Sequence, residues 1–226
     1  MANALNLYDK LQASPLFTGL TSDNLQQIIG QTKFSFNKYH AGQFIKREGE
    51  PCLNLTFLIS GCATAITYAD DYSYSVEEQM EAPKILQPER LFGLTQRYSK
   101  SFRANSTCDT VDIGKNDILR LSDEFLIFRL NLINIVSAIS QKAERAAWHS
   151  LADRSEGRVL QFFKTHIEKP TGQKTIRIKM TRLAAETNES RLAVSKQLNH
   201  FQELGLLSFS RGIISIPAYE KLLHAK

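Results

Sequence analysis

Hydrophobic positions change their spacing along this chain, and each change predicts a different kind of structure. Near the start, apolar residues recur at helical spacing in two short segments, the second of which opens at Thr21-Ser22-Asp23. Both segments are expected to be helices. Their apolar positions are Leu5, Tyr8 and Leu11 in the first and Leu25, Ile28 and Ile29 in the second.

From Phe34 onward the hydrophobic period becomes two, which is the spacing of a half-buried strand. Turn signals separate the candidate strands, among them Gly42, Gly49-Glu50-Pro51, Gly61 and Asp70-Asp71. The candidate strands lie at 34–36, 44–45, 56–59, 63–68, 72–76, 102–104 and 111–113. Several short strands with turns at this density predict a β-barrel or a β-sandwich.

A long helix is expected next, over residues 116–149. Its hydrophobic residues recur at alternating steps of four and three, a seam of the kind that two helices bury against each other. The opposite side of the helix is apolar too, so one face can pack onto the chain's own barrel while the other meets a second copy. We expect the seam to form a dimer interface. The seam residues are Leu121, Phe125, Phe128, Leu132, Ile135 and Ile139, and the opposite residues are Leu126, Leu130 and Ile133.

The C-terminal part combines helices with a hairpin. Two apolar runs, 206–209 and 213–216, flank Ser210-Arg211-Gly212, which predicts a β-hairpin. The other expected elements are a hinge at 149–155, a helix at 157–167, a strand at 173–180 and a short final helix after Pro217.

Between the strand and the hairpin, residues 180–204 have the pattern of a helix-turn-helix, with Thr181 as the expected N-cap of the first helix. In the second helix the apolar side chains recur on one side at helical spacing, and the polar ones lie on the other. One face can therefore pack while the other enters a DNA groove, and the hairpin makes the module a winged helix. The apolar set is Val194, Leu198 and Phe201, and the polar set is Ser190, Arg191, Ser195 and Lys196.

Charge is divided unevenly along the chain. Residues 151–226 hold 13 Lys and Arg against 7 Asp and Glu, a net charge of +6, whereas residues 1–150 hold 15 against 16, a net charge of −1. The basic excess therefore lies with the helix-turn-helix, which favours a polyanionic partner, double-stranded DNA.

Composition narrows the classes of protein that fit. The 226 residues, 42% of them hydrophobic, suffice for one to two domains with ordinary cores. No apolar run approaches the roughly 20 residues of a membrane span, and the start of the chain lacks a secretion signal, so a cytoplasmic protein without a membrane partner is expected. The odd number and wide spacing of Cys52, Cys62 and Cys108 predict buried thiols, with neither disulfides nor a metal site.

Enzyme activity is not expected. The sequence contains no Gly-rich phosphate loop, no His-x-x-x-His pair and no nucleophile elbow, so it offers no catalytic residues and no cofactor site. The alternative to a DNA-binding regulator is a small-molecule binding module whose winged helix makes protein contacts. Gel shifts against genomic fragments distinguish the two, because specific DNA binding depends on sequence and weakens steeply with salt.

Several motifs, taken together, give a family resemblance over essentially the whole chain. The chain resembles the Crp/Fnr regulators, bacterial transcription regulators related to the cyclic-AMP receptor protein and to the fumarate and nitrate reduction regulator. The marks are Leu183-Ala184 to Ser190-Arg191, Val194-Ser195-Lys196-Gln197-Leu198, Leu204-Gly205-Leu206-Leu207 with the wing, and in the barrel residues 41–51 and 57–61.

The resemblance implies an α+β fold in three parts. Residues 1–115 would form a cyclic-nucleotide-binding-like β-barrel, a double-stranded β-helix or jelly roll that acts as the sensor. Residues 116–150 would form the long dimerisation helix and hinge, and residues 151–226 the winged helix-turn-helix. The family further implies a homodimer on a near-palindromic operator, with recognition helices in successive major grooves and RNA polymerase as a further partner.

The resemblance also suggests which residues contact DNA. Arg191 is expected to bind guanine O6 and N7, and its alternative is a surface ion pair with Glu186 or Glu189. Lys196 would read a base or neutralise a phosphate, and the serines suit phosphate contacts. The full expected set is Thr181, Ser190, Arg191, Leu192, Ser195, Lys196, Asn199 and Arg211.

Two residues depart from the family pattern in the helix-turn-helix. Leu192 stands where many relatives have a Glu that accepts a hydrogen bond from cytosine, so the operator should differ from theirs. Asn188 stands in the turn where relatives often have Gly. Because Asn tolerates the left-handed conformation, the turn remains feasible.

The expected effector pocket is degenerate. In relatives that bind cyclic AMP, a Glu holds the ribose and an Arg holds the cyclic phosphate, but here Leu94 and Phe102 occupy those positions. Arg103 is shifted by one residue, which turns a strand side chain to the opposite face unless a bulge intervenes. We therefore expect an effector other than cyclic AMP, either a small apolar ligand or none, with the barrel filled by its own side chains. The pocket is assigned to Phe92, Gly93, Leu94, Phe102 and Arg103.

Overall fold

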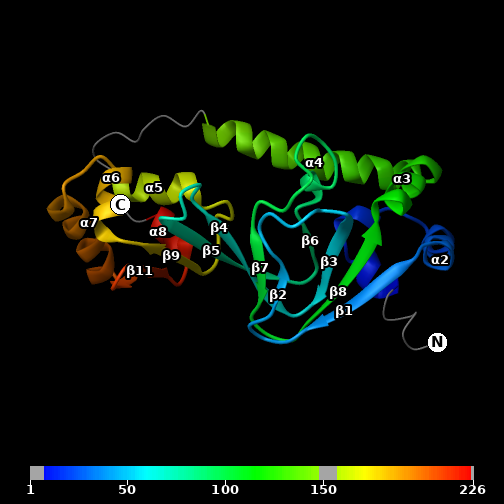
Figure 1. Ribbon diagram of the computed structural model, residues 1–226, viewed down its shortest axis with the longest axis horizontal. Helices are drawn as coiled ribbons and strands as arrows, with labels where there is room; N and C mark the ends of the chain where they lie inside the picture. The colour runs from blue at the N-terminus through cyan, green and yellow to red at the C-terminus, as the bar shows by residue number, and fades with distance from the viewer. Residues whose placement is uncertain (1–7, 148–156, 225–226) are drawn as a thin grey trace. The chain divides into compact units, whose positions relative to one another are not determined.

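The computed structural model describes residues 8–147 and 157–224, and the chain divides into two compact units (Figure 1). Among the described residues, one unit contains 8–63 and 80–147, and the other contains 64–79 and 157–224. A hairpin from the N-terminal half therefore belongs to the C-terminal unit. The position of Leu5 and the hinge expected at 149–155 lie outside the described residues.

Antiparallel strands build the first unit, in agreement with the period of two in the sequence. A four-stranded sheet has the order β1 (Phe34–Tyr39), β8 (Cys108–Gly114), β3 (Asn54–Ser60), β6 (Lys84–Leu86). A second antiparallel pair joins β2 (Phe44–Lys46) to β7 (Ser101–Ala104). Leu55 and Leu58 of β3 are fully buried, and β3 is a central strand with β8 on one side and β6 on the other.

The helices of the first unit come before and after its strands, except for one short helix between β6 and β7. They are η1 (Pro15–Phe17), α2 (Ser22–Gln31), η2 (Pro88–Arg90), α3 (Lys115–Glu124) and α4 (Leu126–Ala147). Thr21 caps α2, since its hydroxyl accepts a hydrogen bond from the Asn24 backbone N–H at 3.2 Å. No helix in the described ranges is both long and apolar enough to cross a membrane.

The single long helix predicted over 116–149 is wrong in one respect, because it is broken into α3 and α4. Phe125 separates them with an extended backbone, φ −122° and ψ 100°, although its N–H still bonds to the Leu121 carbonyl. Figure 1 shows the two helices as successive green ribbons.

The predicted dimer seam needs correction at its first three positions. Leu121, Phe125 and Phe128 are buried within this chain, so they offer no apolar surface to a second copy. Phe17 accounts for part of this burial, because its ring lies 5.5 Å from the ring of Phe128 and 5.8 Å from that of Phe57. The exposed apolar side chains of α4 are instead Leu126, Ile127, Leu130 and Ile133.

The second unit packs helices against one antiparallel sheet. Its strands lie in the order β10 (Ser208–Ser210), β11 (Ile213–Ile216), β9 (Lys174–Ile178), β5 (Tyr74–Glu81), β4 (Cys62–Tyr68). Its helices are α5 (Arg158–His166), α6 (Met180–Glu186), α7 (Arg191–Glu203) and α8 (Tyr219–Leu223). The shared core includes residues from every part of the unit, among them Val76, Phe163, Ile176, Val194, Leu198 and Ile214.

The hairpin of β4 and β5 is an integral part of this sheet. Residues 74–78 of β5 pair with β9 over five positions, from Tyr74 opposite Ile178 to Glu78 opposite Lys174. The Lys174 ammonium is fully buried and lies 3.4 Å from the Glu78 carboxylate, and it donates to the Thr171 carbonyl at 2.8 Å. Burial lowers the pKa of Lys174, and the Glu78 carboxylate opposes that shift.

Candidate nucleic-acid interface

The helix-turn-helix spans α6, a turn over residues 187–190, and α7. Asn188 adopts the left-handed conformation with φ +49°, as the sequence predicted. Thr187 is buried, and the Leu183 carbonyl at the end of α6 accepts hydrogen bonds from its backbone N–H at 3.0 Å and from its hydroxyl at 2.8 Å. The predicted N-cap of α6 is wrong: Lys179 occupies that position, and Thr181 lies exposed within the first turn.

A residue of α5 contacts the turn between α6 and α7. The Arg158 guanidinium donates to the Asn188 carbonyl at 2.8 Å and pairs with the Glu189 carboxylate at 3.5 Å. This contact is not predictable from the sequence, because Arg158 lies 30 residues before Asn188 and no local pattern links them.

The start and the inner face of α7 are well defined. The Ser190 hydroxyl accepts a hydrogen bond from the Ala193 N–H at 3.1 Å, so Ser190 is the N-cap of this helix. Val194, Leu198 and Phe201 are buried and hold α7 against the core, as their spacing predicted. A phosphate contact by Ser190 stays a prediction.

The outer face of α7 is polar and basic. Arg191, Lys196 and Asn199 are exposed, together with the apolar Leu192, and Ser195 is half-buried. Neither Arg191 nor Lys196 forms an ion pair with any of the described residues. These two side chains are therefore free to contact an anion.

The alternative ion pairs considered for Arg191 are taken by other arginines. Glu186 lies 2.6 Å from Arg182, and Glu189 lies 3.5 Å from Arg158. Each carboxylate already has a guanidinium partner, so each offers less attraction to Arg191.

The wing has the predicted hairpin form. β10 and β11 pair antiparallel, and Arg211 and Gly212 at the tip have φ values of +47° and +81°. Two successive residues with positive φ are typical of a type I′ turn, whose twist matches that of the strands. Arg211 is exposed.

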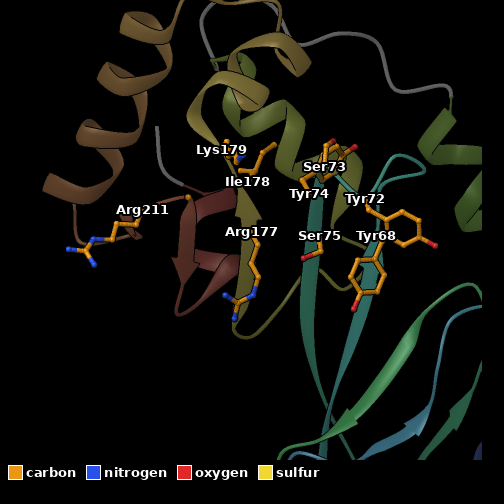
Figure 2. A pocket seen from close by; sticks show the side chains of 10 residues that line it. Tyr68, Tyr72, Ser73, Tyr74, Ser75, Arg177, Ile178, Lys179 and Arg211 are labelled. Carbon is orange, nitrogen blue, oxygen red and sulfur yellow. The ribbon is translucent and has the colours of Figure 1, made fainter.

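A pocket of about 290 Å³ lies beside the wing and is lined by residues of the hairpin of β4 and β5, of β9 and of the wing tip. Figure 2 shows Tyr68 and Tyr72 on its hairpin side, while the Arg211 side chain points away from it. The Glu77 carboxylate holds Arg177 in the pocket wall at 2.6 Å. The residues predicted to form an effector pocket lie elsewhere, in the first unit.

Two aromatic side chains lie buried at that predicted pocket in the first unit. Phe102, which replaces the phosphate-binding Arg of relatives, is 2% exposed and makes an edge-on contact with Tyr98 at 6.3 Å between ring centroids. Arg103 is half-buried. The register shift near it lies on the partner strand, between Phe44 and Lys46, so β7 itself contains no bulge that would turn Arg103 to the Phe102 side.

The loop before β7 departs from the pocket prediction. Leu94 is fully exposed, so its assignment to a buried pocket is wrong. It follows Gly93, whose φ of +93° turns the chain at the surface. Phe92 is half-buried, and the Lys115 ammonium lies 4.8 Å from the centre of its ring.

The cysteines are free thiols. Cys52 and Cys108 are buried, and burial raises the pKa of both, which keeps them protonated and poorly reactive. Cys62 is half-buried. Among the described residues, no group of three or more His, Cys, Asp or Glu side chains could hold a metal ion.

No protein-family model and no curated protein matches the sequence. Solved structures do match. The sensor domain of the transcriptional regulator DNR from Pseudomonas aeruginosa aligns at 20% identity with a TM-score of 0.53, covering 68% of this chain and 100% of that domain.

Full-length relatives also align, with lower scores. The catabolite activator protein of Thermus thermophilus covers 93% of this chain and 96% of its own at 19% identity and a TM-score of 0.45. DNR from Pseudomonas aeruginosa covers 95% of both chains at 19% identity and a TM-score of 0.45. The likeness to the DNR sensor domain, with the winged helix described above, shows that this chain has a Crp/Fnr-like fold.

Proposed function

We propose that this chain is a transcription regulator of the Crp/Fnr family that binds double-stranded DNA as a homodimer, with α7 in the major groove. The observation that carries the proposal is the outer face of α7, where Arg191 and Lys196 are exposed while the nearby acids Glu186 and Glu189 are engaged elsewhere. A cationic face on a packed helix suits a phosphate-lined groove. The Crp/Fnr-like fold supports the same function.

Individual contacts follow from the chemistry of each side chain. The Arg191 guanidinium would bind guanine O6 and N7, and the Asn199 amide would bind adenine N6 and N7. Lys196, Ser195 and Arg211 would contact phosphates, with Arg211 reaching from the wing. Thr181, exposed in the first turn of α6, would make a further contact with the DNA backbone.

The dimer would form through the outer face of α4. Leu126, Leu130 and Ile133 lie at steps of four and three, so they make one exposed apolar stripe along the helix. The same stripe on a second copy is a self-complementary partner, as a two-fold interface requires. Leu132, Ile135 and Ile139, the remaining residues of the predicted seam, are half-buried and lie on the opposite side of the helix from this stripe. We keep the boundaries at residues 115 and 150 as part of this proposal, with residues 64–79 of the first part completing the sheet of the winged unit.

Cyclic AMP would not be the effector. A buried phenyl ring at Phe102 offers no charge to a cyclic phosphate, and burying that phosphate without a guanidinium is costly. The contact between Tyr98 and Phe102 favours a barrel that is filled by its own side chains, and hence a regulator without an effector, over one that holds an apolar ligand. Isothermal titration should show no stoichiometric micromolar binding of cyclic AMP or cyclic GMP.

Selection from a random pool of duplex DNA tests the proposal. The full-length protein should enrich a near-palindromic sequence, and its affinity in gel shifts should fall steeply as salt rises. Failure to enrich any sequence, or retention that ignores sequence, would favour the alternative in which the winged helix makes protein contacts. We expect the protein to act in the cytoplasm, where RNA polymerase would be a further partner at the promoters that it binds.

A further inference from the structure

Leu192 occupies the centre of the exposed face of α7. An α-helix turns by about 100° per residue, so Leu192, Lys196 and Asn199 fall on one stripe. That stripe lies opposite the buried residues Val194, Leu198 and Phe201. Leu192 is 66% exposed and lies in the first turn of the helix.

Exposure of one leucine is ordinary on a protein surface, so only the residues around Leu192 can indicate whether it has a role in binding. Arg191 precedes it and Lys196 follows one turn later, both exposed and without an ion pair to the described residues. The sequence from Ser190 to Gln202 contains no Asp or Glu. Leu192 is therefore a single apolar side chain on a surface that is otherwise polar and basic.

A protein partner would fit this surface poorly. Protein-binding patches join several apolar side chains, and the other strongly exposed leucine near α7 is Leu204, at the C-cap, three turns away. Repeated cations around a single apolar group instead match the major groove of DNA. There the phosphates are anionic, and the apolar group that a base edge presents is the C5 methyl of thymine.

We propose that Leu192 reads the C5 methyl group of a thymine beside the guanine contacted by Arg191. The inference rests on the proposed function, and it adds the chemical group that this position recognises. Consecutive residues of a helix are displaced by about 1.5 Å along its axis, so the thymine lies within one or two base pairs of that guanine. Leucine offers no hydrogen bond, and its selectivity comes from excluding water from the methyl group.

A deoxyuridine scan tests the proposal, because deoxyuridine differs from thymidine only by the missing methyl. The full-length protein first selects its operator from random duplex DNA, and each thymine of one half-site is then replaced in turn. Fluorescence anisotropy at a single salt concentration measures Kd. We expect one position where the wild type loses roughly fourfold in affinity, the effect of one buried methyl-sized group at about 0.8 kcal/mol.

Leu192→Ala should remove this sensitivity, so that the thymine and deoxyuridine duplexes bind the variant equally. A cytosine and a 5-methylcytosine at the same position give a second readout: the added methyl should improve binding by the wild type and not by the variant. Leu204→Ala is the matched control, since Leu204 is 50% exposed and caps the far end of the same helix. The deoxyuridine scan of this control variant should show the same sensitive thymine as the scan of the wild type.

The outcomes separate the two claims. An operator that shows no sensitive thymine, or a methyl penalty that persists in Leu192→Ala, overturns the inference while the proposed function stands. If no operator is enriched, the proposed function fails, and the inference fails with it.

Discussion

Two helices of this protein, α7 and α4, each bury one face and expose another, but their exposed faces differ in kind. The outer face of α7 presents Arg191, Lys196 and Asn199, whereas the outer face of α4 presents Leu126, Leu130 and Ile133. A free cationic face is stabilised by an anion, and a free apolar face by another apolar surface. This difference is the reason why we propose that α7 binds DNA and that α4 meets a second copy of the chain.

The largest predicted effect comes from charging the apolar face. The double variant Leu130→Asp, Ile133→Asp would bury unpaired carboxylates in the dimer and should yield a monomer in light scattering. Its affinity for the operator should fall by more than about 100-fold, because each subunit then binds its half-site alone. Leu119→Asp on α3 is the control, since Leu119 is also exposed but lies outside the stripe. A dimer that survives the double substitution would contradict the role of α4.

The next effect concerns the inner face of α4. Phe128→Ala removes a fully buried ring from the core of the first unit and should lower the free energy of unfolding by about 3–5 kcal/mol in chemical denaturation. The folded protein should remain a dimer, as judged by light scattering. Unchanged stability with weaker association would instead restore Phe128 to the dimer interface.

A smaller effect is expected at the cationic face. Arg191→Ala should lower specific affinity by about 1–3 kcal/mol, which corresponds to roughly 5- to 150-fold, through the lost guanine contact. Non-specific binding and dimer mass should change little. Lys221→Ala on α8 removes a cation of the same unit and should leave operator discrimination intact. If both substitutions weaken binding equally, Arg191 contributes only its positive charge and does not read a guanine.

The smallest effect is at the start of α7. Ser190→Ala removes the hydroxyl that caps the Ala193 N–H and should destabilise the protein by about 1 kcal/mol. Ser190→Thr keeps a capping hydroxyl and should recover most of that loss. Urea titrations followed by circular dichroism measure both. A full loss of DNA binding without loss of stability would show that the hydroxyl contacts phosphate.

The winged helix was predictable because its signals are local. The spacing of Val194, Leu198 and Phe201, the turn residue Asn188, and the Arg211-Gly212 tip each act over a few neighbouring residues. Such patterns set the conformation wherever the segment lies in the chain.

The errors arose where distant residues decide the outcome. Periodicity placed Phe128 and Leu130 on different faces, but contacts with distant residues such as Phe17 determine which face is buried. The break at Phe125 carries no Gly or Pro signal. The exposure of Leu94 likewise depends on how its loop leaves the barrel.

The pairing of β5 with β9 joins segments about 100 residues apart, as the Arg177 to Glu77 ion pair shows. No local pattern contains that information. The consequence is that residues 64–79 complete the sheet of the winged unit and share its core through Val76.

Protection of guanine N7 from dimethyl sulfate on the selected operator tests the central claim most directly, because that atom lies in the major groove where Arg191 is proposed to bind. The wild type should protect one guanine in each half-site, with the half-sites centred about one helical turn apart. Arg191→Ala should leave the same guanines as reactive as in free DNA. Protection that persists in this variant, or no protected guanine in the wild-type complex, would contradict the assignment of α7 as the DNA-reading helix.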